Sequence, residues 1–400
     1  MAGIPASLSG RTMSGMTLTT TDLNHAPLDA PLALLGGLSP QQFMRRHWQK
    51  KPLLIRQAMP GIKPPLDRAA MFALAAQDDV ESRLIVQDPD TGEWRLRQGP
   101  LPRRALPKLD QPGWTLLVQG LDLHVPAAHA LLKQFGFVPQ ARVDDVMISY
   151  ATDGGGVGPH YDSYDVFLLQ VQGRRRWRVG PLKDSSLRLD APLKILANFE
   201  PQEEWVLEAG DMLYLPPLWG HDGVADGECL TCSIGFRAPE ATEITREVLG
   251  RCAEALEPSA KPRLYKDPQQ PATDQPGRIP ADLQQFALDA VQRFLSDPHQ
   301  VHTALGESLT ELKPRVWFDI GEPLPDGVGV VLDARTRMAY DDKRIFANGE
   351  SWLAAGADAR LMRALADRRQ LSAAAVAKAS ADARELLGQW SDDGWLHPLV

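Results

Sequence analysis

The sequence predicts a mainly β domain, a small barrel or sandwich with flanking helices, followed by a helical segment and a smaller mixed module. From about Ser82 to Pro239, short apolar or alternating runs are separated by Gly, Pro and Asp, which is typical of strands and turns. After Pro239 the apolar spacing becomes helical. The length of 400 residues is also more than one domain usually needs.

The N-terminal elements precede the strand-rich region. Residues 1–30 are rich in Ser, Thr and Gly and are predicted to be a flexible lead. Ser39 is a candidate N-cap with Pro40 at the first helical position, so a helix is expected to start there. A strand over Pro52–Ile55 and a helix over Asp67–Ala76 are expected to follow.

The strand-rich region defines the main domain, with predicted bounds 31–240. A helix over His129–Phe137 interrupts it. A turn is expected at Gln172–Gly173, between two of the later strands. The predicted strands lie in these runs: SRLIVQD, EWRLRQG, GWTLLVQG, DVMISYAT, HYDSYDVFLLQVQG, RRRWRVG, EEWVLEAGD, MLYLPP and ECLTCSIGFRAP.

Two helices are expected in the segment 241–305. They cover Ala241–Leu256 and Ala281–Leu295, and both are amphipathic. A Pro/Gln/Asp-rich linker over 265–280 separates them.

The last unit, 306–400, has the size and element order of a small winged-helix-like module. It is expected to contain a short strand around Arg315–Phe318 and a hairpin within GVGVVLDARTRMAYDD. Helices are expected over Asp358–Asp367 and Ala373–Leu387.

Composition limits the function classes. A formal net charge of −8 does not attract nucleic acid to the chain as a whole and suits a basic protein partner. Three cysteines argue against a disulfide framework and for a reducing compartment, so the cytoplasm is the expected location. No apolar run is long enough for a transmembrane helix, so no membrane association is expected.

His160, Asp162 and His221 are the candidate metal ligands. His160 and Asp162 are two residues apart, which on a strand places both side chains on one face. His221 follows a strand that runs into a Pro/Gly turn. Two histidines and one carboxylate on one side of a metal leave coordination positions open, as in non-haem iron(II) oxygenases. The alternative is a surface pair and an ordinary loop histidine.

Arg175 is the candidate anion-binding residue. Alternation along GRRRWRVG places it on one face with Trp177 and Val179. A buried arginine needs an anionic partner, which a dicarboxylate co-substrate would supply. The alternative is a basic hairpin with every arginine in solvent.

The run ECLTCSIGF has a small, polar face on which Thr231 or Ser233 is available to hydrogen-bond such a co-substrate. Its two cysteines would point to opposite faces of a strand, and no second C-x-x-C occurs, so a zinc site is not expected.

These motifs resemble the JmjC branch of the cupin oxygenases, and more narrowly the bacterial ribosomal oxygenases that hydroxylate an arginine of a large-subunit ribosomal protein. The resemblance spans most of the chain and rests on LSPQQFMRRHWQKKPLLIRQA, GGGVGPHYDSYDVFLLQ, GRRRWRVG, GDMLYLPPLWGH and SIGFRAP. It implies a double-stranded β-helix, the cupin/JmjC barrel, followed by a helical dimerisation segment and a winged-helix-like module. It also implies Fe(II), 2-oxoglutarate and O2 as cofactor and co-substrates.

By this resemblance His160, Asp162 and His221 hold iron, Arg175 binds the distal carboxylate of 2-oxoglutarate, and Ser233 assists it. The middle helices imply a homodimer. The resemblance gives the winged-helix-like unit no DNA-binding role, and the unit is slightly acidic here, so direct DNA binding is not expected.

An arginine substrate would need an acidic or aromatic cradle, for which Asp153 and Tyr164 are candidates; the alternative for Asp153 is that it caps a turn. Two other functions remain open. One is a JmjC hydroxylase or demethylase acting on histidine or methyl-lysine, and the other is a non-catalytic cupin binding module.

Overall fold

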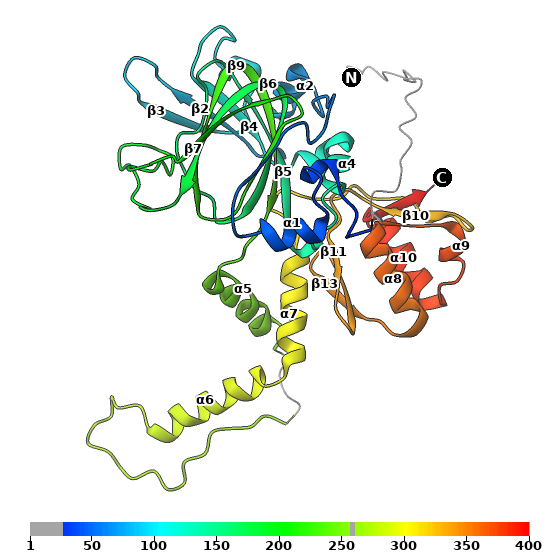
Figure 1. Cartoon of the computed structure of the whole chain (residues 1–400). Helices are drawn as coiled ribbons and strands as arrows, with labels where there is room; N and C mark the ends of the chain where they lie inside the picture. The colour runs from blue at the N-terminus through cyan, green and yellow to red at the C-terminus, as the bar shows by residue number, and fades with distance from the viewer. Residues whose placement is uncertain (1–26, 257–260, 400) are drawn as a thin grey trace, which may run out of the picture.

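The computed structural model describes residues 27–256 and 261–399 (Figure 1). Most of the predicted lead over 1–30 therefore lies outside the described residues. Within them, nine strands form one antiparallel sheet in the order β1-β8-β6-β9-β5-β4-β2-β3, with β7 paired to β6. The sheet curls into a barrel (Figure 1), which confirms the predicted fold class. The strands are β1 Leu53–Ile55, β2 Ser82–Gln87, β3 Trp94–Gln98, β4 Trp114–Val118, β5 Val143–Ala151, β6 Asp165–Pro181, β7 Glu203–Glu208, β8 Met212–Leu215 and β9 Trp219–Phe236.

The two longest strands, β6 and β9, pair along most of their length and form the centre of the sheet. The turn expected at Gln172–Gly173 is wrong, because β6 continues through these residues with register shifts at this point. Gly173 has a φ of 66°, and a Cβ there would lie 2.2 Å from the backbone oxygen of Glu228. Only glycine therefore fits this bulge, which bends the strand without ending it.

Helices of the N-terminal half cover one side of the barrel. The expected start of α1 (Pro40–Arg46) is confirmed, because Ser39 and Gln42 form a capping box. Pro126 occupies the first turn of α4 (Pro126–Lys133), so that helix begins earlier and ends earlier than predicted. The other short elements here are α2 Arg68–Leu74, α3 Leu121–His124, and 3₁₀ turns at Ala33–Leu35, Arg103–Ala105 and Gln140–Arg142. They pack on a core dominated by the aromatic side chains Phe43, Trp48, Phe135, Phe167, Tyr214 and Phe236.

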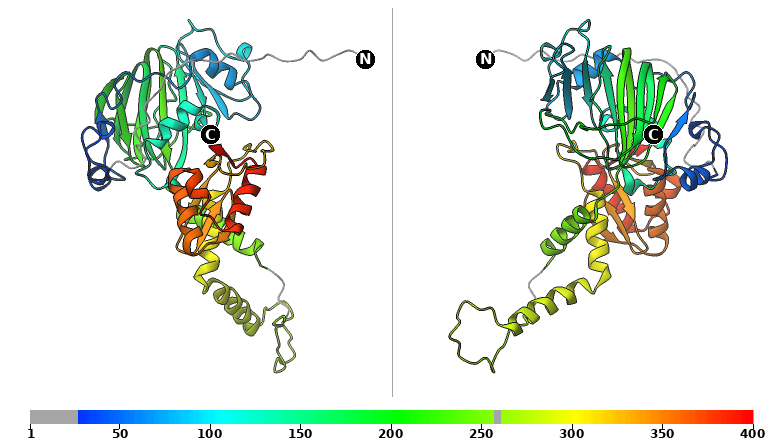
Figure 2. Two further views of the ribbon diagram at one scale, coloured as in Figure 1. Left: turned by 90° about the vertical axis from the view of Figure 1, so that its right-hand side faces the viewer. Right: turned by 60° about the vertical axis from the view of Figure 1, so that its left-hand side comes forward.

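Among the described residues, three helices link the barrel to the C-terminal unit. They are α5 Ala241–Glu254, α6 Ala281–Leu295 and α7 Pro298–Thr310. The sequence prediction missed α7, although Asp297 caps it and Pro298 begins it. The predicted boundary between 305 and 306 falls inside this helix. In contrast to α5 and α7, which pack together, α6 extends away from the rest of the chain (Figure 1 and Figure 2).

The C-terminal unit holds two three-stranded sheets and three helices. β10 (Gly329–Leu332) pairs with β14 (Gln370–Leu371) and β15 (Leu396–Leu399). β11 (Met338–Tyr340) pairs with β12 (Arg344–Ala347), which pairs with β13 (Glu350–Leu353). The expected hairpin across residues 327–342 is therefore wrong, since β10 and β11 belong to different sheets.

Two further expectations in this unit are wrong. The segment Arg315–Phe318 is not a strand, and Arg315 instead takes a φ of 67° in a turn. The helix expected over Ala373–Leu387 is two helices, α9 Ala373–Val376 and α10 Ala381–Asp392, because Ser380 caps a new start. The remaining helix, α8 Gly356–Arg368, was predicted in its central part.

Candidate metal centre

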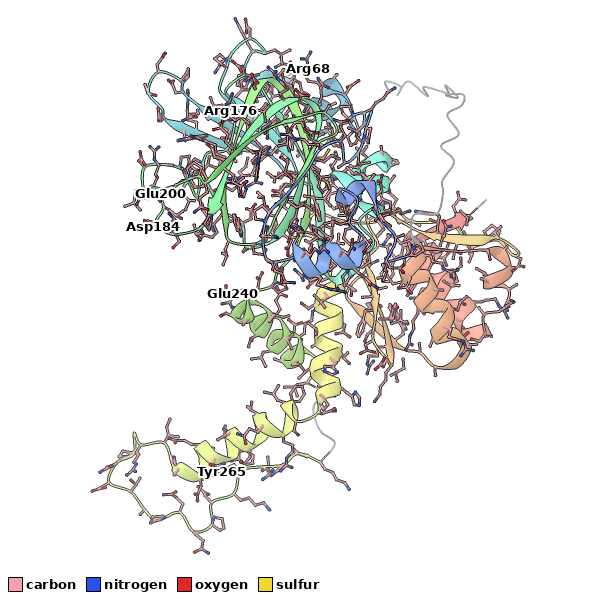
Figure 3. All side chains as sticks on the ribbon, viewed as in Figure 1. Arg68, Arg176, Asp184, Glu200, Glu240 and Tyr265 are labelled. Atoms are coloured by element: carbon pink, nitrogen blue, oxygen red, sulfur yellow. The ribbon has the colours of Figure 1, made fainter. Side chains whose placement is uncertain are left out.

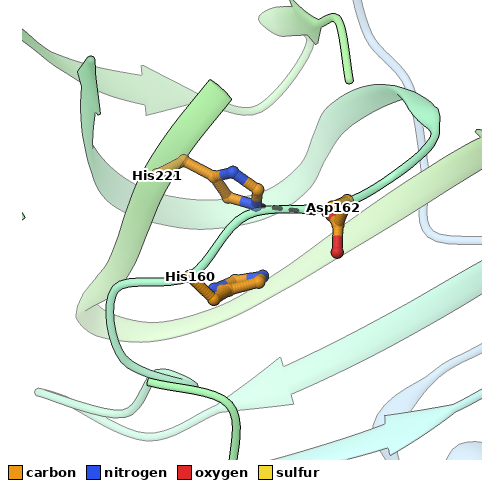
Figure 4. A group of neighbouring side chains, drawn as sticks. All are labelled: His160, Asp162 and His221. Atoms are coloured by element: carbon orange, nitrogen blue, oxygen red, sulfur yellow. Dashed lines mark ion pairs between the residues drawn. The ribbon is translucent and has the colours of Figure 1, made fainter. Parts of the chain in front are cut away.

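His160, Asp162 and His221 come together at one point of the barrel (Figure 4). One ligand atom from each lies within 4.8 Å of the others, a spacing that a single metal ion can bridge. The expected reason for this convergence is wrong, because His160 and Asp162 precede β6 instead of sharing a face of it. His160 instead forms an isolated antiparallel bridge with His221, which belongs to β9.

Both imidazoles are oriented by backbone carbonyls. His160 Nδ1 lies 2.8 Å from the oxygen of Gly158, and His221 Nδ1 lies 2.9 Å from the oxygen of Trp219. A carbonyl only accepts, so each Nδ1 carries the proton and each Nε2 has a free lone pair. Burial, with a smaller effect of His160, lowers the pKa of His221 to about 4. The neutral imidazole that binds metal is thus the form favoured near neutral pH.

Two glycines leave room for this centre. Gly158 has a φ of 77°, and a Cβ there would lie 3.1 Å from Ile195 and 3.2 Å from Trp94. A Cβ on Gly223 would lie only 2.6 Å from the ring of Trp177, which in turn packs 5.9 Å from the His221 ring. Bare backbone at these positions therefore allows the indole and the ligand-bearing segment to pack closely.

Arg175 is buried inside the barrel without a counter-charge. Its side chain and those of Trp177 and Val179 are buried, whereas those of Arg174, Arg176 and Arg178 are exposed, which confirms the predicted alternation. Arg176, for example, pairs with Glu204 at 2.7 Å on the outer surface (Figure 3). Arg175 donates from Nη1 to Ser149 Oγ at 3.1 Å, while its Nε and Nη2 have no partner among the described residues. An uncompensated buried guanidinium is costly, so this position fits an anionic ligand.

Hydroxyl side chains on two neighbouring strands share the face of the sheet that contacts this guanidinium. Ser149 on β5 is opposite Thr231 on β9, and Ser233 is opposite Met147, so the two serines and Thr231 share one face of the sheet. The direct contact to Arg175 comes from Ser149, which sequence reasoning missed. The alternation of side chains along β5 can be read from the sequence. Which residues of other strands lie next to Ser149 depends on the register between β5 and β9. Ser233 is buried, and Thr231 donates to Gln170 at 2.8 Å.

The two candidate substrate residues have different surroundings. Asp153 is exposed and its carboxylate accepts from the Gly227 backbone at 2.8 Å, which is a turn-capping contact. Tyr164 is half-buried just before β6. Burial and the nearby Asp162 carboxylate raise the pKa of Tyr164 well above its usual value, so its hydroxyl stays protonated.

The two cysteines of the C-x-x-C pair are buried and unbonded in β9. In the described part of the chain, the cluster of potential metal ligands consists of His160, Asp162 and His221, and it includes neither cysteine. The helices in the same part include none that is both long and apolar enough to span a bilayer.

Comparison with known proteins places this centre in a family. The JmjC domain family matches residues 130–244, and the ROXA-like winged helix matches residues 292–397. The ribosomal protein uL16 3-hydroxylase of Escherichia coli is 34% identical over 292 residues, which are 71% of this chain and 74% of that relative. A protein named "Probable ribosomal oxygenase" in Haemophilus influenzae is 40% identical over 211 residues, 52% of each chain.

The solved structures agree. YcfD, a ribosomal oxygenase from Escherichia coli in complex with cobalt and 2-oxoglutarate, superimposes with a TM-score of 0.77 at 27% identity, over 91% of this chain and 99% of that one. The barrel with two histidines and an aspartate at one point defines a JmjC-domain protein. Within that class, the chain belongs to the ribosomal oxygenase family.

Proposed function

We propose that this chain is an Fe(II)- and 2-oxoglutarate-dependent dioxygenase that hydroxylates a ribosomal protein, with His160, Asp162 and His221 as the iron ligands. The observation that carries the proposal is the convergence of these ligands, with both Nδ1 atoms held by backbone carbonyls, in a barrel that also buries an uncompensated arginine. When bound, iron and 2-oxoglutarate supply the chemistry that activates O2 for insertion into a C–H bond.

The chain's own residues position the co-substrate. Arg175 has two unpartnered nitrogens, enough to grip the distal carboxylate of 2-oxoglutarate in bidentate fashion. Ser149 holds the guanidinium in place at 3.1 Å. Ser233, on the same face of β9, is proposed to hydrogen-bond the same carboxylate. The indole of Trp177 is itself buried, and its ring lies 5.9 Å from the Arg175 guanidinium carbon.

The substrate side chain is proposed to be an arginine. Tyr164 is half-buried just before β6, and its aromatic face suits a guanidinium by stacking. Asp153 is proposed as the acidic contact, which the substrate would recruit from its present turn-capping role. The net charge of −8 favours approach of a basic protein such as a ribosomal one.

Peptide-resolved mass spectrometry of ribosomes tests this function. Ribosomal proteins from a strain lacking the gene are compared with those from the same strain carrying the wild-type chain or Asp162→Asn. The expected result is one arginine that gains a single oxygen atom only with the wild-type chain. Oxygen gained on histidine, or methyl groups lost from lysine, would replace the arginine assignment. An unchanged proteome together with no succinate formed from 2-oxoglutarate would favour a non-catalytic binding module.

We also propose that α6 forms a homodimer contact. None of its residues is buried, although it is amphipathic. Leu288 and Val291 are 50% and 58% exposed. The Phe286 ring lies 5.7 Å from the ring of Tyr265, which Figure 3 labels. An apolar stripe of this kind needs a partner. Light scattering should give a dimer for the wild-type chain and a monomer for Leu288→Glu; a wild-type monomer would remove the proposal.

A further inference from the structure

A cavity of about 80 Å³ lies between the barrel domain and the C-terminal unit, away from the metal centre. One wall comes from α4 and the start of β5, and the other from the loop before β11 and the end of α8. This volume is enough for a few waters or one small ion. The residues that line it are unusually rich in basic side chains.

Three of these basic side chains have no carboxylate at ion-pair distance among the described residues. They are Lys133 on α4, Arg337 before β11 and Arg369 at the end of α8. Two other cations in the lining are already neutralised: Lys313 pairs with Asp144 at 2.9 Å, and Arg335 with Asp333 at 2.8 Å. The positive charge left in the cavity therefore belongs to the first three residues.

Arg369 is fixed and incompletely satisfied. It is more than nine-tenths buried, and its Nη2 donates to the backbone oxygens of Asp333 at 2.6 Å and Thr336 at 3.0 Å. Its Nε has no partner in the described structure. His129, also in the lining, has a buried Nδ1 without a partner. Buried polar atoms of this kind are normally hydrogen-bonded. Arg369 Nε is always a donor, so it points to a missing acceptor, whereas the partner that His129 Nδ1 needs depends on the tautomer of the ring.

The cations also repel one another. Burial, and then the Arg369 charge, lowers the pKa of Lys133. Burial, followed by Arg369 and Lys133, lowers the pKa of His129 to about 3. Two carboxylates share the lining, but Asp144 is committed to Lys313 and Arg237, and Asp122 accepts from the Val146 backbone. Nearby carboxylates attract these arginines only from beyond ion-pair distance: Asp144 and Asp122 act on Arg337, and Asp333 and Asp122 act on Arg369.

We propose that this cavity binds a small oxyanion of the phosphate class, held by Lys133, Arg337 and Arg369, and that the anion joins the C-terminal unit to the barrel. Phosphate presents several acceptor oxygens, which match a guanidinium fork on one wall and an ammonium on the other. Arg337 already reaches across the boundary, since its Nη2 lies 3.4 Å from the backbone oxygen of Val143 on β5. A bound anion would attract the cations of both walls, which repel one another when the anion is absent.

Titration of the full chain with inorganic phosphate at constant ionic strength tests the proposal. Calorimetry and thermal unfolding are both recorded, with chloride as the reference anion. The expected result is one saturable phosphate site per chain and a rise in melting temperature. In crystals free of phosphate and sulfate, soaked selenate should give one anomalous peak between Lys133, Arg337 and Arg369. Absence of saturable binding, or a selenate peak elsewhere only, would overturn the proposal.

Variants locate the site. Lys133→Met and Arg337→Met should each weaken phosphate binding roughly tenfold, because each removes a charge-assisted hydrogen bond. Lys133→Arg keeps the charge and should retain binding, which separates loss of the site from loss of fold if Lys133→Met is unstable. Lys378→Met is the matched control, since this lysine is exposed on the C-terminal unit, which also carries Arg337, and lies outside the cavity. Equal affinity in all four variants would refute the assignment.

Discussion

The backbones of His160 and His221 exchange a pair of hydrogen bonds, at 2.9 Å and 2.8 Å, and so hold two metal ligands side by side. Their ring centroids are 4.2 Å apart. The main chain therefore determines the spacing of the two imidazoles, and the carbonyls of Gly158 and Trp219 determine which nitrogen faces inward. Because backbone hydrogen bonds already hold these two ligands in place, the site needs little rearrangement to bind a metal ion.

This preorganisation predicts that metal stabilises the fold and that the effect needs His221. Cobalt(II) at about a hundred times its dissociation constant should add roughly 2.7 kcal/mol to the free energy of unfolding of the wild-type chain. His221→Ala should lose this gain, whereas His302→Ala, at an exposed histidine of α7, should keep it. Thermal unfolding with cobalt and with a chelator measures both. The same metal response in the two variants would remove His221 from the ligand set.

A second prediction concerns Arg175, whose charge is unpaired among the described residues. Arg175→Met should raise the KM for 2-oxoglutarate about 30-fold, because a charge-assisted contact of roughly 2 kcal/mol is lost. Without co-substrate, the variant should be as stable as the wild type or more stable, since an uncompensated buried charge is removed. Arg176→Met, on the exposed face of the same strand, is the control. A marked loss of stability in Arg175→Met with an unchanged KM would show a structural role instead.

Short-range pattern predicted much of this arrangement. Period-two alternation was sufficient to bury Arg175 and expose Arg176, because the pleat of a strand fixes the side of each residue. The N-cap at Ser39, with Pro40 at the first helical position, also depends only on neighbours in sequence. Both features are decided locally, and both were predicted correctly.

Long-range pairing was the part that the sequence did not reveal. The contact from Arg175 to Ser149 requires the register of β5 on β9, which no local pattern encodes. The chain also places Asp162 outside β6, so the strand geometry expected for the ligand pair does not apply. In the same way β10 pairs with β15 and not with the nearby β11, because tertiary packing overrides proximity in sequence.

Asp122 predicts a pH dependence of stability. Burial raises its pKa to about 6, so the folded chain binds this proton more tightly than the unfolded chain does. Stability from this group is therefore greatest below about pH 4 and falls by roughly 3 kcal/mol as pH rises through 6. Asp122→Asn keeps an acceptor for the Val146 amide, at 2.7 Å in the wild type, and does not titrate.

The free energies of unfolding of wild type and Asp122→Asn in urea, at pH 4 and pH 7, check this sign. The two should be similar at the lower pH, and the variant should be more stable at the higher one. Asp78→Asn, at an exposed aspartate, serves as the control for a general effect of charge removal. A variant less stable than wild type at pH 7 would mean that ionised Asp122 is stabilised by its surroundings.

Gly223 provides the last prediction, because a side chain there would collide with Trp177 at 2.6 Å. Gly223→Ala should lower the free energy of unfolding by about 1–3 kcal/mol, as overpacking of a core does. It should also weaken cobalt(II) binding, since displacing Trp177 disturbs the His221 ring 5.9 Å away. Gly250→Ala is the matched control: no atom lies within 4 Å of its Cβ, and in the interior of α5 alanine should add about 0.5–1 kcal/mol of stability. If Gly223→Ala binds cobalt normally despite its lower stability, the Trp177 packing supports the barrel but not the metal ligands.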